Sequence, residues 1–438
     1  MTAAIWALAL PIIVANSVHV VINLTDAKFV SMLGETELAA VGLSRPVMFF
    51  VGALFMGIGA ASTAMVARAV GAGDYDRADH VAGQAIILTL LLSVLVGAAG
   101  YLLAPQILRA LAAPGEVLSQ AQGYLRINFV GLASLFTLGV SGGILRGAGD
   151  AKTPLVMSAI AAALNAILDP LFIFGLLGLP ALGVKGAAVA SVLAQCLGAG
   201  LSLAVLIRGR LRVRLRLREF SFDGRAVLRM ISIGLPASVQ MGLRALMANF
   251  LARFVAGFGE AVLAAYTVGM SLEQIAFMPT FGIAEASAAL VGQNLGARKP
   301  DRARRSALIA MGYCIGVMGS MAIVFALAAP HLMAAFGLSG DGVRAGTLFL
   351  RINALSLSFS AVGISLNRAM GGAGDTLPTM VFTVVSLWVV QVPLAWMLKG
   401  VPELGASGIW WAGVIASFLQ AAMTAAYFLT GRWAKKKL

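Results

Sequence analysis

Four polar side chains form a stripe along the first long apolar segment of the sequence. Asn16, His19, Asn23 and Asp26 are separated by three, four and three residues, a spacing that places them on one face of an α-helix. A carboxyl group inside an apolar helix is costly and marks a path for protons or cations. We therefore interpret Asp26 as an ion-coupling residue and the other three as lining a cavity. The alternative is an interfacial Asp26 paired with nearby Lys28.

A second polar pair lies in the fifth apolar segment. Asn165 and Asp169 are four residues apart, so they share one helical face. Pro170 follows directly, and its ring removes a backbone donor and loosens the carbonyl four residues earlier. A carboxylate, an amide and a freed carbonyl suit a proton or Na⁺. The alternative is a polar group that only packs against a neighbouring helix.

The second half of the chain carries a different set of polar groups. Gln240 and Arg244 are four residues apart, and Glu273 lies in the next apolar segment. An unpaired buried charge is strongly destabilising, so we expect Arg244 to pair with Glu273. Flexible thioethers and aromatic faces, such as Met241 and Phe277, suit apolar cations. These five residues are our candidates for the substrate cavity of this half.

No enzyme chemistry is evident in the sequence. It has no Gly-Lys dipeptide and therefore no phosphate-binding loop of the Walker type. No Ser-His-Asp set and no zinc signature is present, and the three histidines are scattered. We expect neither enzymatic activity nor a cofactor. If the protein moves a compound uphill, an ion gradient must supply the energy.

The composition points to a helical membrane protein. Of the 438 residues, 60% are hydrophobic and 11% are charged, whereas soluble domains carry about 25% charged residues. The apolar runs have the length of membrane-spanning helices, about 20 residues. We predict an all-α polytopic protein with twelve spans, near 4–30, 39–67, 81–103, 120–145, 154–177, 184–207, 229–255, 261–292, 306–330, 346–370, 379–399 and 407–430.

The basic residues gather on one side of these spans. The linker between the halves alternates Arg with apolar residues, and the tail holds Arg432, Lys435, Lys436 and Lys437. Basic loops stay in the cytoplasm, so both termini are expected there, and the net charge of +14 does not indicate nucleic acid. The linker is expected either to lie extended on the lipid headgroups or to be a solvated connector. The basic linker residues are Arg208, Arg210, Arg212, Arg214, Arg216, Arg218, Arg225 and Arg229.

The sequence repeats itself at an offset of 225 residues. Pro11 corresponds to Pro236, and the stretches starting at Asp76, Leu125 and Ala148 recur in the second half. A constant offset indicates a duplicated six-helix unit, with the two bundles related by an axis along the membrane normal. We predict an N-terminal lobe at 1–207, a linker at 208–228 and a C-terminal lobe at 229–438. The recurring stretches are Asp76-Arg77-Ala78 with Asp301-Arg302-Ala303, Leu125-Arg126-Ile127-Asn128 with Leu350-Arg351-Ile352-Asn353, and Ala148-Gly149-Asp150 with Ala373-Gly374-Asp375.

These features resemble the multidrug and toxic compound extrusion (MATE) transporters, in particular the DinF-like branch. The resemblance covers essentially the whole chain. It implies a two-lobe drug/cation antiporter in which Asp26, Asn165 and Asp169 form a proton- or Na⁺-linked site. It also implies a hydroxyl residue on the sixth span, for which Ser191 is the match. The resemblance rests on Leu8-Ala9-Leu10-Pro11, Arg146-Gly147-Ala148-Gly149-Asp150, Asn165-Ala166-Ile167-Leu168-Asp169-Pro170, Gly183-Val184-Lys185-Gly186-Ala187-Ala188 and Gly234-Leu235-Pro236.

The function expected from residues and resemblance together is export of cationic or lipophilic compounds from the cell against inward H⁺ or Na⁺. A bacterial inner-membrane location, contact with membrane lipid and a monomeric state are expected. Two alternatives stay open. A flippase for lipid-linked oligosaccharides would need a cationic cavity, and a passive channel would not depend on one carboxyl group.

Overall fold

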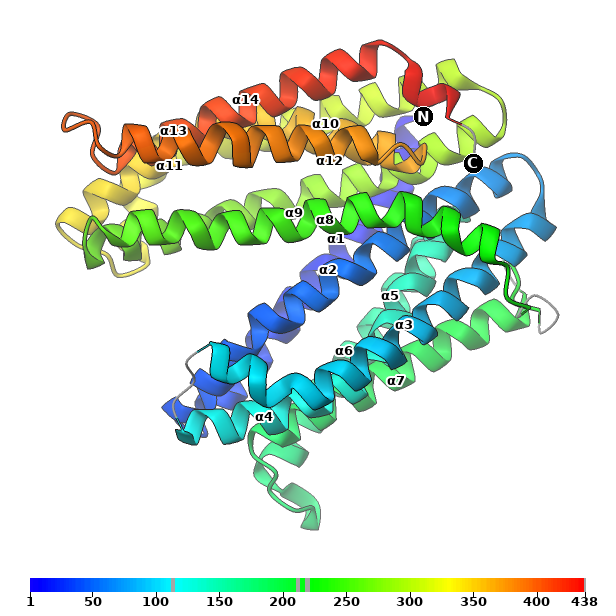
Figure 1. Ribbon diagram of the computed structural model, residues 1–438, viewed down its shortest axis with the longest axis horizontal. Helices are drawn as coiled ribbons and strands as arrows, with labels where there is room; N and C mark the ends of the chain where they lie inside the picture. Colours follow the sequence, from blue (N-terminus) through cyan, green and yellow to red (C-terminus); the bar gives the residue numbers. More distant parts are fainter. Residues whose placement is uncertain (112–114, 210–212, 217–220, 437–438) are drawn as a thin grey trace. The chain divides into compact units, whose positions relative to one another are not determined.

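The computed structural model describes residues 1–111, 115–209, 213–216 and 221–436, and within these ranges the chain is helical without a strand (Figure 1). Of the basic residues named above, Arg210, Arg212, Arg218 and Lys437 lie outside the described residues. The long helices of the first half are α1 (Thr2–Ser31), α2 (Glu35–Gly71), α3 (Tyr75–Ala110), α4 (Gly115–Val130), α5 (Leu132–Gly147), α6 (Lys152–Phe174) and α7 (Val184–Arg208). Those of the second half are α8 (Gly224–Ala256), α9 (Glu260–Gly296), α10 (Pro300–Ala335), α11 (Asp341–Gly372), α12 (Leu377–Thr383), α13 (Val392–Leu398) and α14 (Ser407–Leu429).

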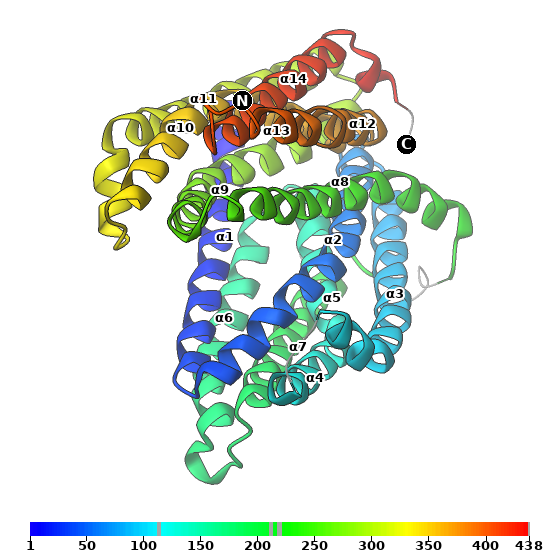
Figure 2. The same cartoon turned by 60° about the vertical axis from the view of Figure 1, so that its left-hand side comes forward.

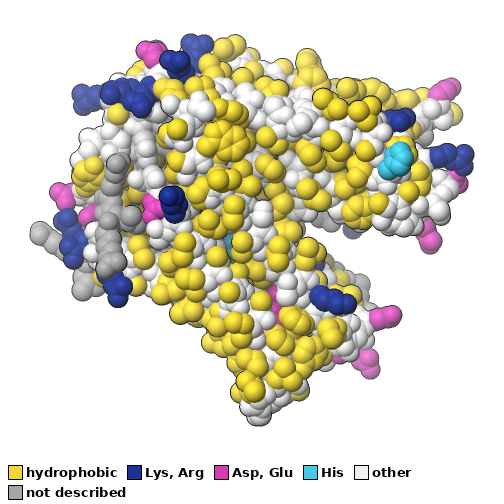
Figure 3. Space-filling model, turned by 180° about the vertical axis from the view of Figure 1, so that it is seen from behind, with side chains coloured by type: hydrophobic (Ala, Val, Ile, Leu, Met, Phe, Trp, Pro, Cys, Tyr) yellow, Lys and Arg dark blue, Asp and Glu magenta, His cyan; other side chains and the backbone are white. Residues whose placement is uncertain are grey.

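The prediction of an all-α protein with twelve spans is confirmed. Eleven stretches of the described residues are long and apolar enough to cross a membrane, and the pair α4 and α5, bent by 50°, completes the twelve. The eleventh span runs from α12 through a π-helical segment, Val384–Gln391, into α13. On the face seen in Figure 3, hydrophobic side chains cover the helices and charged side chains gather mainly near their ends. The protein is therefore an integral membrane protein.

The described chain forms two compact units whose boundaries differ from the predicted lobes. The N-terminal unit is Val14–Leu235, and the C-terminal unit joins Met1–Ile13 to Pro236–Leu438. The boundaries fall inside α1 and α8 rather than in the linker, because the first part of each helix packs away from the rest of its own half. Figure 2 labels the same helices from a second side. The predicted two-fold relation between the bundles stays a prediction.

Glycines explain where the first parts of α1 and α8 pack. In the N-terminal unit, Gly234 of α8 lies against the backbone of Gly57 on α2, where a Cβ at Gly234 would come within 2.8 Å of Gly57 O. In the C-terminal unit, Gly282 of α9 lies against α1, where a Cβ would come within 3.4 Å of Ala9 O. Removing the Cβ lets two backbones approach closely. The two contacts are equivalent in the repeat: Gly57 and Gly282 are 225 residues apart, and so are Ala9 and Gly234, which is the offset predicted from the sequence.

A second duplicated contact supports the same repeat. Arg126 Nε donates to Tyr101 O at 3.3 Å, and Arg351 Nε donates to Ala326 O at 3.2 Å. Arg126 and Arg351 are 225 residues apart, and so are the two acceptors. The duplication that the sequence predicts is therefore present as duplicated tertiary contacts, one set within each unit.

The linker packs against α3. Val213 and Leu215 are fully or almost fully buried, and the backbone N–H of Arg214 donates to Asp79 Oδ1 at 2.6 Å. Arg216 also pairs with Asp79, at 3.3 Å. The described linker residues are thus anchored, so the alternative of a solvated connector is wrong for them, whereas an extended segment on the headgroups stays a prediction. In residues 213–216 the apolar side chains are buried against the protein and the Arg side chains are exposed.

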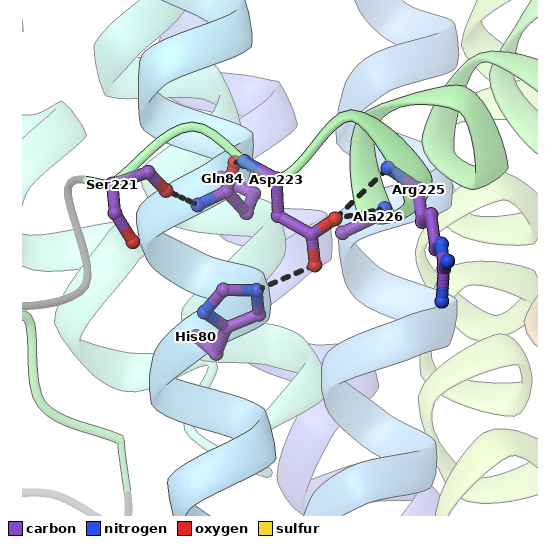
Figure 4. A network of polar contacts seen from close by, with 6 residues as sticks. All are labelled: His80, Gln84, Ser221, Asp223, Arg225 and Ala226. Atoms are coloured by element: carbon purple, nitrogen blue, oxygen red, sulfur yellow. Dashed lines mark hydrogen bonds and ion pairs between the residues drawn. The ribbon is translucent and has the colours of Figure 1, made fainter.

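A cluster of polar side chains lies where the linker ends and α8 begins (Figure 4). Gln84 of α3 donates to Ser221 O at 2.6 Å and accepts from the backbone N–H of Asp223 at 2.9 Å. The hydrogen bond from His80, at 3.1 Å, and those from the backbone N–H groups of Ala226 and Arg225 hold the pKa of the Asp223 carboxyl below its ordinary value. Asp223 thereby caps α8 and ties it to α3.

Candidate functional site

Asn165 and Asp169 form the buried centre of the site in the N-terminal unit. They lie one turn apart on α6, with 4% and 0% of their surfaces exposed. Asn165 Nδ2 donates to Asp169 Oδ1 at 3.1 Å. The helical spacing that suggested a shared face thus brings the amide onto the carboxyl. Pro170 directly after the pair does not end α6, which continues to Phe174.

Ser191 on α7 joins this pair. Its Oγ lies 3.4 Å from Asn165 Nδ2, so one amide group contacts both a carboxyl oxygen and a hydroxyl. α7 begins at Val184 after Gly183, whose positive φ of 55° favours glycine. The turn at Gly183 and the length of α7 place Ser191 beside α6. The residues alone did not indicate Ser191, since a serine in an apolar helix has no distinguishing spacing.

Asp26 completes the cluster, because its carboxyl group lies beside that of Asp169 and the two interact. An ionised carboxylate only accepts hydrogen bonds, so two neighbouring carboxyl groups bond to each other only when one of them is protonated. The other oxygens, Asp26 Oδ1 and Asp169 Oδ2, are buried without a hydrogen-bond partner in the described structure. Two neighbouring acids thus lie where a shared proton or a bound cation would relieve their mutual repulsion.

Two further residues lie near this acidic pair (Asp26 and Asp169) that the sequence did not assign to the site. Arg45 of α2 interacts electrostatically with Asp26, and Tyr124 of α4 interacts with both acids. Tyr124 also packs against the apolar cluster around Val30 and Ile173. A lone Arg or Tyr gives no periodic signal, so only the packing of α2 and α4 on α1 and α6 brings them near.

The rest of the predicted stripe does not join the acidic pair. Asn16, His19 and Asn23 form no hydrogen bond to one another or to Asp26 within the described residues, and the side chains of His19 and Asn23 are exposed on α1. They share a helical face with Asp26, as predicted, but a shared face of α1 does not bring their polar groups together. Their role in lining a cavity stays a prediction.

The acidic pair could hold a cation through oxygen ligands. Within the described residues, no group of three or more His, Cys, Asp or Glu could hold a metal ion. The available ligand atoms are the two carboxyl groups, the Asn165 side chain and the Ser191 hydroxyl, all hard oxygen donors apart from the amide nitrogen. Such a set fits Na⁺ or a proton better than a transition metal.

The C-terminal unit contains a cavity of about 210 Å³. Arg244 of α8 and Glu273 and Phe277 of α9, three of the predicted cavity residues, line it. The other two do not: Met241 is not among the lining residues, and Gln240 Nε2 donates to Thr379 O at 3.1 Å and to Thr383 Oγ1 at 2.6 Å.

The expected ion pair between Arg244 and Glu273 is wrong for the described structure. Arg244 Nη2 instead donates to Gln420 Oε1 of α14 at 3.1 Å. Glu273 Oε1 is buried without a hydrogen-bond partner. The other acid of α9, Glu285, pairs with Arg368 at 3.0 Å. The hydrogen-bond partner of Arg244 is thus Gln420, far away in the sequence, and not Glu273 on the neighbouring helix.

Several polar residues of the cavity were missed from the sequence. Asn353 belongs to a repeated stretch and was taken as part of the fold, whereas Gln391 is a polar residue in an otherwise apolar span and could have been noticed. Gln391 ends the π-helical segment of the eleventh span. The other missed polar lining residues are Ser356, Ser360 and Ser417.

Comparisons with known proteins agree with this arrangement. The MatE family matches residues 11–171 and 236–397, two segments whose starts are 225 residues apart. A Thermotoga maritima protein named probable multidrug resistance protein NorM is 28% identical over 434 residues, covering 98% of this chain and 92% of the relative. A protein of the same name from Deinococcus radiodurans is 31% identical and covers 98% and 94%.

A solved structure gives the same result for the fold. The outward-facing structure of a multidrug resistance MATE family transporter of the MOP superfamily matches with a TM-score of 0.89 and 28% identity, over 99% of this chain and 96% of that one. The expectation that the protein is a transporter and not an enzyme is confirmed, whereas its assignment to the DinF-like branch stays a prediction. With its twelve spans, its duplicated halves and matches over both of them, the chain belongs to the MatE family of membrane transporters.

Proposed function

We propose that the protein is a secondary active exporter that antiports cationic or lipophilic compounds out of the cell against inward H⁺. The observation that carries this proposal is the proximity of two acids, the half-buried Asp26 and the buried Asp169. Two acids this close favour the uptake of a proton, and intramembrane acids are typical of proton relays. We further propose a bacterial inner-membrane location with both termini in the cytoplasm, as the basic loops indicate, and a monomer.

Coupling follows from the charge of the acidic pair. When the pair loses its proton, it repels itself and attracts a cation, which favours an open, hydrated site. When the pair regains the proton, it carries one negative charge less. α1 can then close on α6 without removing two ionised carboxylates from water, which would be costly. Substrate and proton then favour opposite states, as exchange requires. The membrane potential adds about 2.3 kcal/mol per charge for each 100 mV.

Na⁺ is the second candidate for the coupling ion. The carboxyl groups of Asp26 and Asp169, the Asn165 side-chain oxygen and the Ser191 hydroxyl are ligands of the hard oxygen type that Na⁺ shares with other hard cations. We favour the proton, because one shared proton removes the repulsion between two adjacent acids without any further ligand.

The substrate class is proposed from two sources. The relatives from Thermotoga maritima and Deinococcus radiodurans are named as multidrug resistance proteins. In addition, the aromatic and thioether walls of the cavity in the C-terminal unit suit lipophilic compounds, apolar cations included.

The test is efflux of a fluorescent lipophilic cation from proteoliposomes. A pH gradient and a Na⁺ gradient are imposed separately on the wild type and on Asp26→Asn. We expect efflux driven by the pH gradient in the wild type and its loss in the variant, because an Asn amide donates to Asp169 without a proton from solution.

Other outcomes overturn parts of the proposal. Efflux driven by Na⁺ alone would replace H⁺ as the coupling ion. Equal pH-driven efflux in Asp26→Asn and the wild type would remove the acidic pair from coupling. No efflux under either gradient would contradict drug export and make a flippase for lipid-linked substrates the next hypothesis.

A further inference from the structure

Two adjoining grooves lie on the surface of the N-terminal unit, where α4 packs against both α3 and α7 (Figure 2). The first groove, of about 550 Å³, is lined by α3, α4 and α5, and the second, of about 390 Å³, by α3, α4 and α7. Tyr101 and Val130 line both, so the two grooves share a border. Together they form one long hollow, the α4 groove, which spans the 50° bend between α4 and α5.

The walls of the α4 groove are apolar and exposed. Val94 and Leu102 of α3 and Val130 of α4 keep 69%, 68% and 71% of their surfaces exposed. Gly97 and Ala98 of α3 also line the groove, and their lack of long side chains leaves the surface hollow there. Because these helices span the membrane, the apolar walls face acyl chains rather than water. An empty hollow would forfeit dispersion contacts, so a hydrocarbon chain is the expected filling.

Two basic side chains line one end of the α4 groove, Arg126 of α4 and Lys185 of α7. Lys185 packs over Gly123 of α4, where a Cβ would come within 2.4 Å of Lys185 Cε. Gly123 and Arg126 are three residues apart and therefore share a face of α4, which brings the two positive charges near one another. No acid lines this part of the groove, and neither side chain forms an ion pair within the described residues. Two uncompensated positive charges on a lipid-facing surface attract an anion.

Neutral groups hold the Arg126 guanidinium in a fixed orientation. Its Nε donates to Tyr101 O at 3.3 Å, and the guanidinium lies over the Tyr101 ring, 4.9 Å from the centroid. With its side-chain oxygen toward Arg126, Gln122 accepts from both terminal nitrogens, at 2.9 and 3.2 Å. A guanidinium has five N–H donors, and these contacts use three. One donor is left on each terminal nitrogen, the arrangement that binds phosphate oxygens in pairs.

The C-terminal unit repeats only the arginine of this arrangement. Arg351 donates to Ala326 O as Arg126 donates to Tyr101 O, so the backbone contact belongs to the duplicated fold. The aromatic ring under the guanidinium is missing there, because Ala326 stands in the place of Tyr101.

The lysine is also particular to the N-terminal unit. Gly186 of α7 and Gly408 of α14 make equivalent contacts, because a Cβ at either would come within 2.3 or 2.5 Å of a carbonyl oxygen of the preceding helix. Ser407 before Gly408 therefore stands in the place of Lys185 before Gly186. The second positive charge is thus not required by the repeated fold, which points to a separate role.

We propose that the α4 groove binds one phospholipid with an anionic headgroup, with the phosphate on Arg126 and Lys185 and an acyl chain along the apolar walls past Val130. Lys185 is the second residue of α7, at the end of a span where lipid phosphates lie. Val94 at the other end of the groove lies near the middle of α3. A headgroup with its own ammonium brings a third positive charge to the basic end, whereas an anionic headgroup does not. The proposal is independent of the exporter function.

The first test measures lipid binding to the purified, delipidated protein by native mass spectrometry. Phosphatidylglycerol and phosphatidylcholine with identical acyl chains are compared. We expect phosphatidylglycerol to bind about thirtyfold more tightly, from about fivefold for each basic residue. Equal affinities would overturn the proposal. Soluble glycerophosphoglycerol, which has the headgroup without chains, should bind far more weakly, and binding as tight as that of the lipid would overturn the role of the apolar walls.

The second test assigns the preference to the two basic residues. Lys185→Gln and Arg126→Gln should each weaken binding of phosphatidylglycerol about fivefold and leave phosphatidylcholine unchanged. Arg351→Gln loses the same backbone contact as Arg126→Gln, and Arg109→Gln removes an exposed charge from the end of α3; both should bind as the wild type does. If Arg126→Gln does not fold, Lys185→Gln decides alone, because Lys185 forms no hydrogen bond within the described residues. An unchanged preference in Lys185→Gln, or an equal loss in the controls, would overturn the assignment.

The third test places the acyl chain. Val130→Trp fills the border that the two grooves share and should weaken binding of both lipids by the same factor, so that the preference for phosphatidylglycerol remains. Val324→Trp, an exposed position on α10, should leave both affinities unchanged. Unchanged affinities in Val130→Trp would contradict the placement of the chain in the α4 groove.

Discussion

Gly234→Ala should destabilise the N-terminal unit, because α8 and α2 cross at this residue. A Cβ at Gly234 would lie 2.8 Å from Gly57 O, 2.9 Å from Gly57 C and 3.3 Å from Ile58 N. All three are backbone atoms, so the helices must separate by some tenths of an ångström. Overpacking of this kind costs about 1–3 kcal/mol.

The matched control is Gly242→Ala on the same helix, where a Cβ would meet no atom within 4 Å. Both substitutions gain the same helix preference of alanine over glycine, about 0.5–1 kcal/mol. The difference between the two variants is therefore the overpacking cost alone. For a unit of this size, about 2–4 °C per kcal/mol, Gly234→Ala should melt several degrees below Gly242→Ala.

The assay is the apparent melting temperature of each purified variant in detergent, followed by tryptophan fluorescence. Gly282→Ala, the equivalent position of the C-terminal unit, should also melt below Gly242→Ala, because a Cβ there would lie 2.4 Å from Ile13 Cγ1, on a stiff β-branched side chain, and 3.2 Å from the backbone atom Ile13 N. Equal melting temperatures for Gly234→Ala and Gly242→Ala would refute the close backbone crossing.

Three further predictions concern polar contacts. His80 lowers the pKa of Asp223 in the folded chain, so the contribution of Asp223 to stability is present above the unfolded pKa of about 3.9 and is lost as the pH falls through the lowered value. The wild type should therefore melt at a higher temperature than Asp223→Asn at neutral pH and at the same temperature in strong acid. A difference in melting temperature that does not change with pH would contradict this. Asn165→Leu removes the amide that donates to Asp169 and should slow pH-driven efflux about tenfold or more, with unchanged efflux as the contrary result. Asp150→Ala removes the acceptor for the first N–H groups of α6 and should cost about 0.5–2 kcal/mol, measured as a lower melting temperature; an unchanged value would show that water caps the helix equally well.

The spans were predictable from the sequence because the membrane leaves little freedom. A run of apolar residues long enough to cross must be a helix, since every backbone group needs a partner within it. The repeat was predictable for the same kind of reason, because Arg126 and Arg351 recur with their own acceptors. The unit boundaries were not predictable, because they depend on the close contacts of Gly234 and Gly282, which leave no trace in hydropathy.

The candidate site was predictable only in part. The spacing of Asn165 and Asp169 is local, so the helix alone brings them together. Contacts between helices were harder to predict from the sequence. Charge complementarity suggested that Arg244 pairs with Glu273, whereas the guanidinium of Arg244 donates a hydrogen bond to Gln420, 176 residues further along the chain. A charged residue has several possible neutral partners in a helical bundle, and only packing decides among them.

The most direct measurement of the central claim is infrared difference spectroscopy of the purified protein at neutral pH. The claim, which we propose from the proximity of Asp26 and Asp169, is that the two acids share one proton. The account predicts a carbonyl band of a protonated carboxyl group in the wild type that is missing in both Asp26→Asn and Asp169→Asn, because an amide then donates in place of the proton. A wild-type spectrum without this band, or a band that both variants retain, would contradict the account.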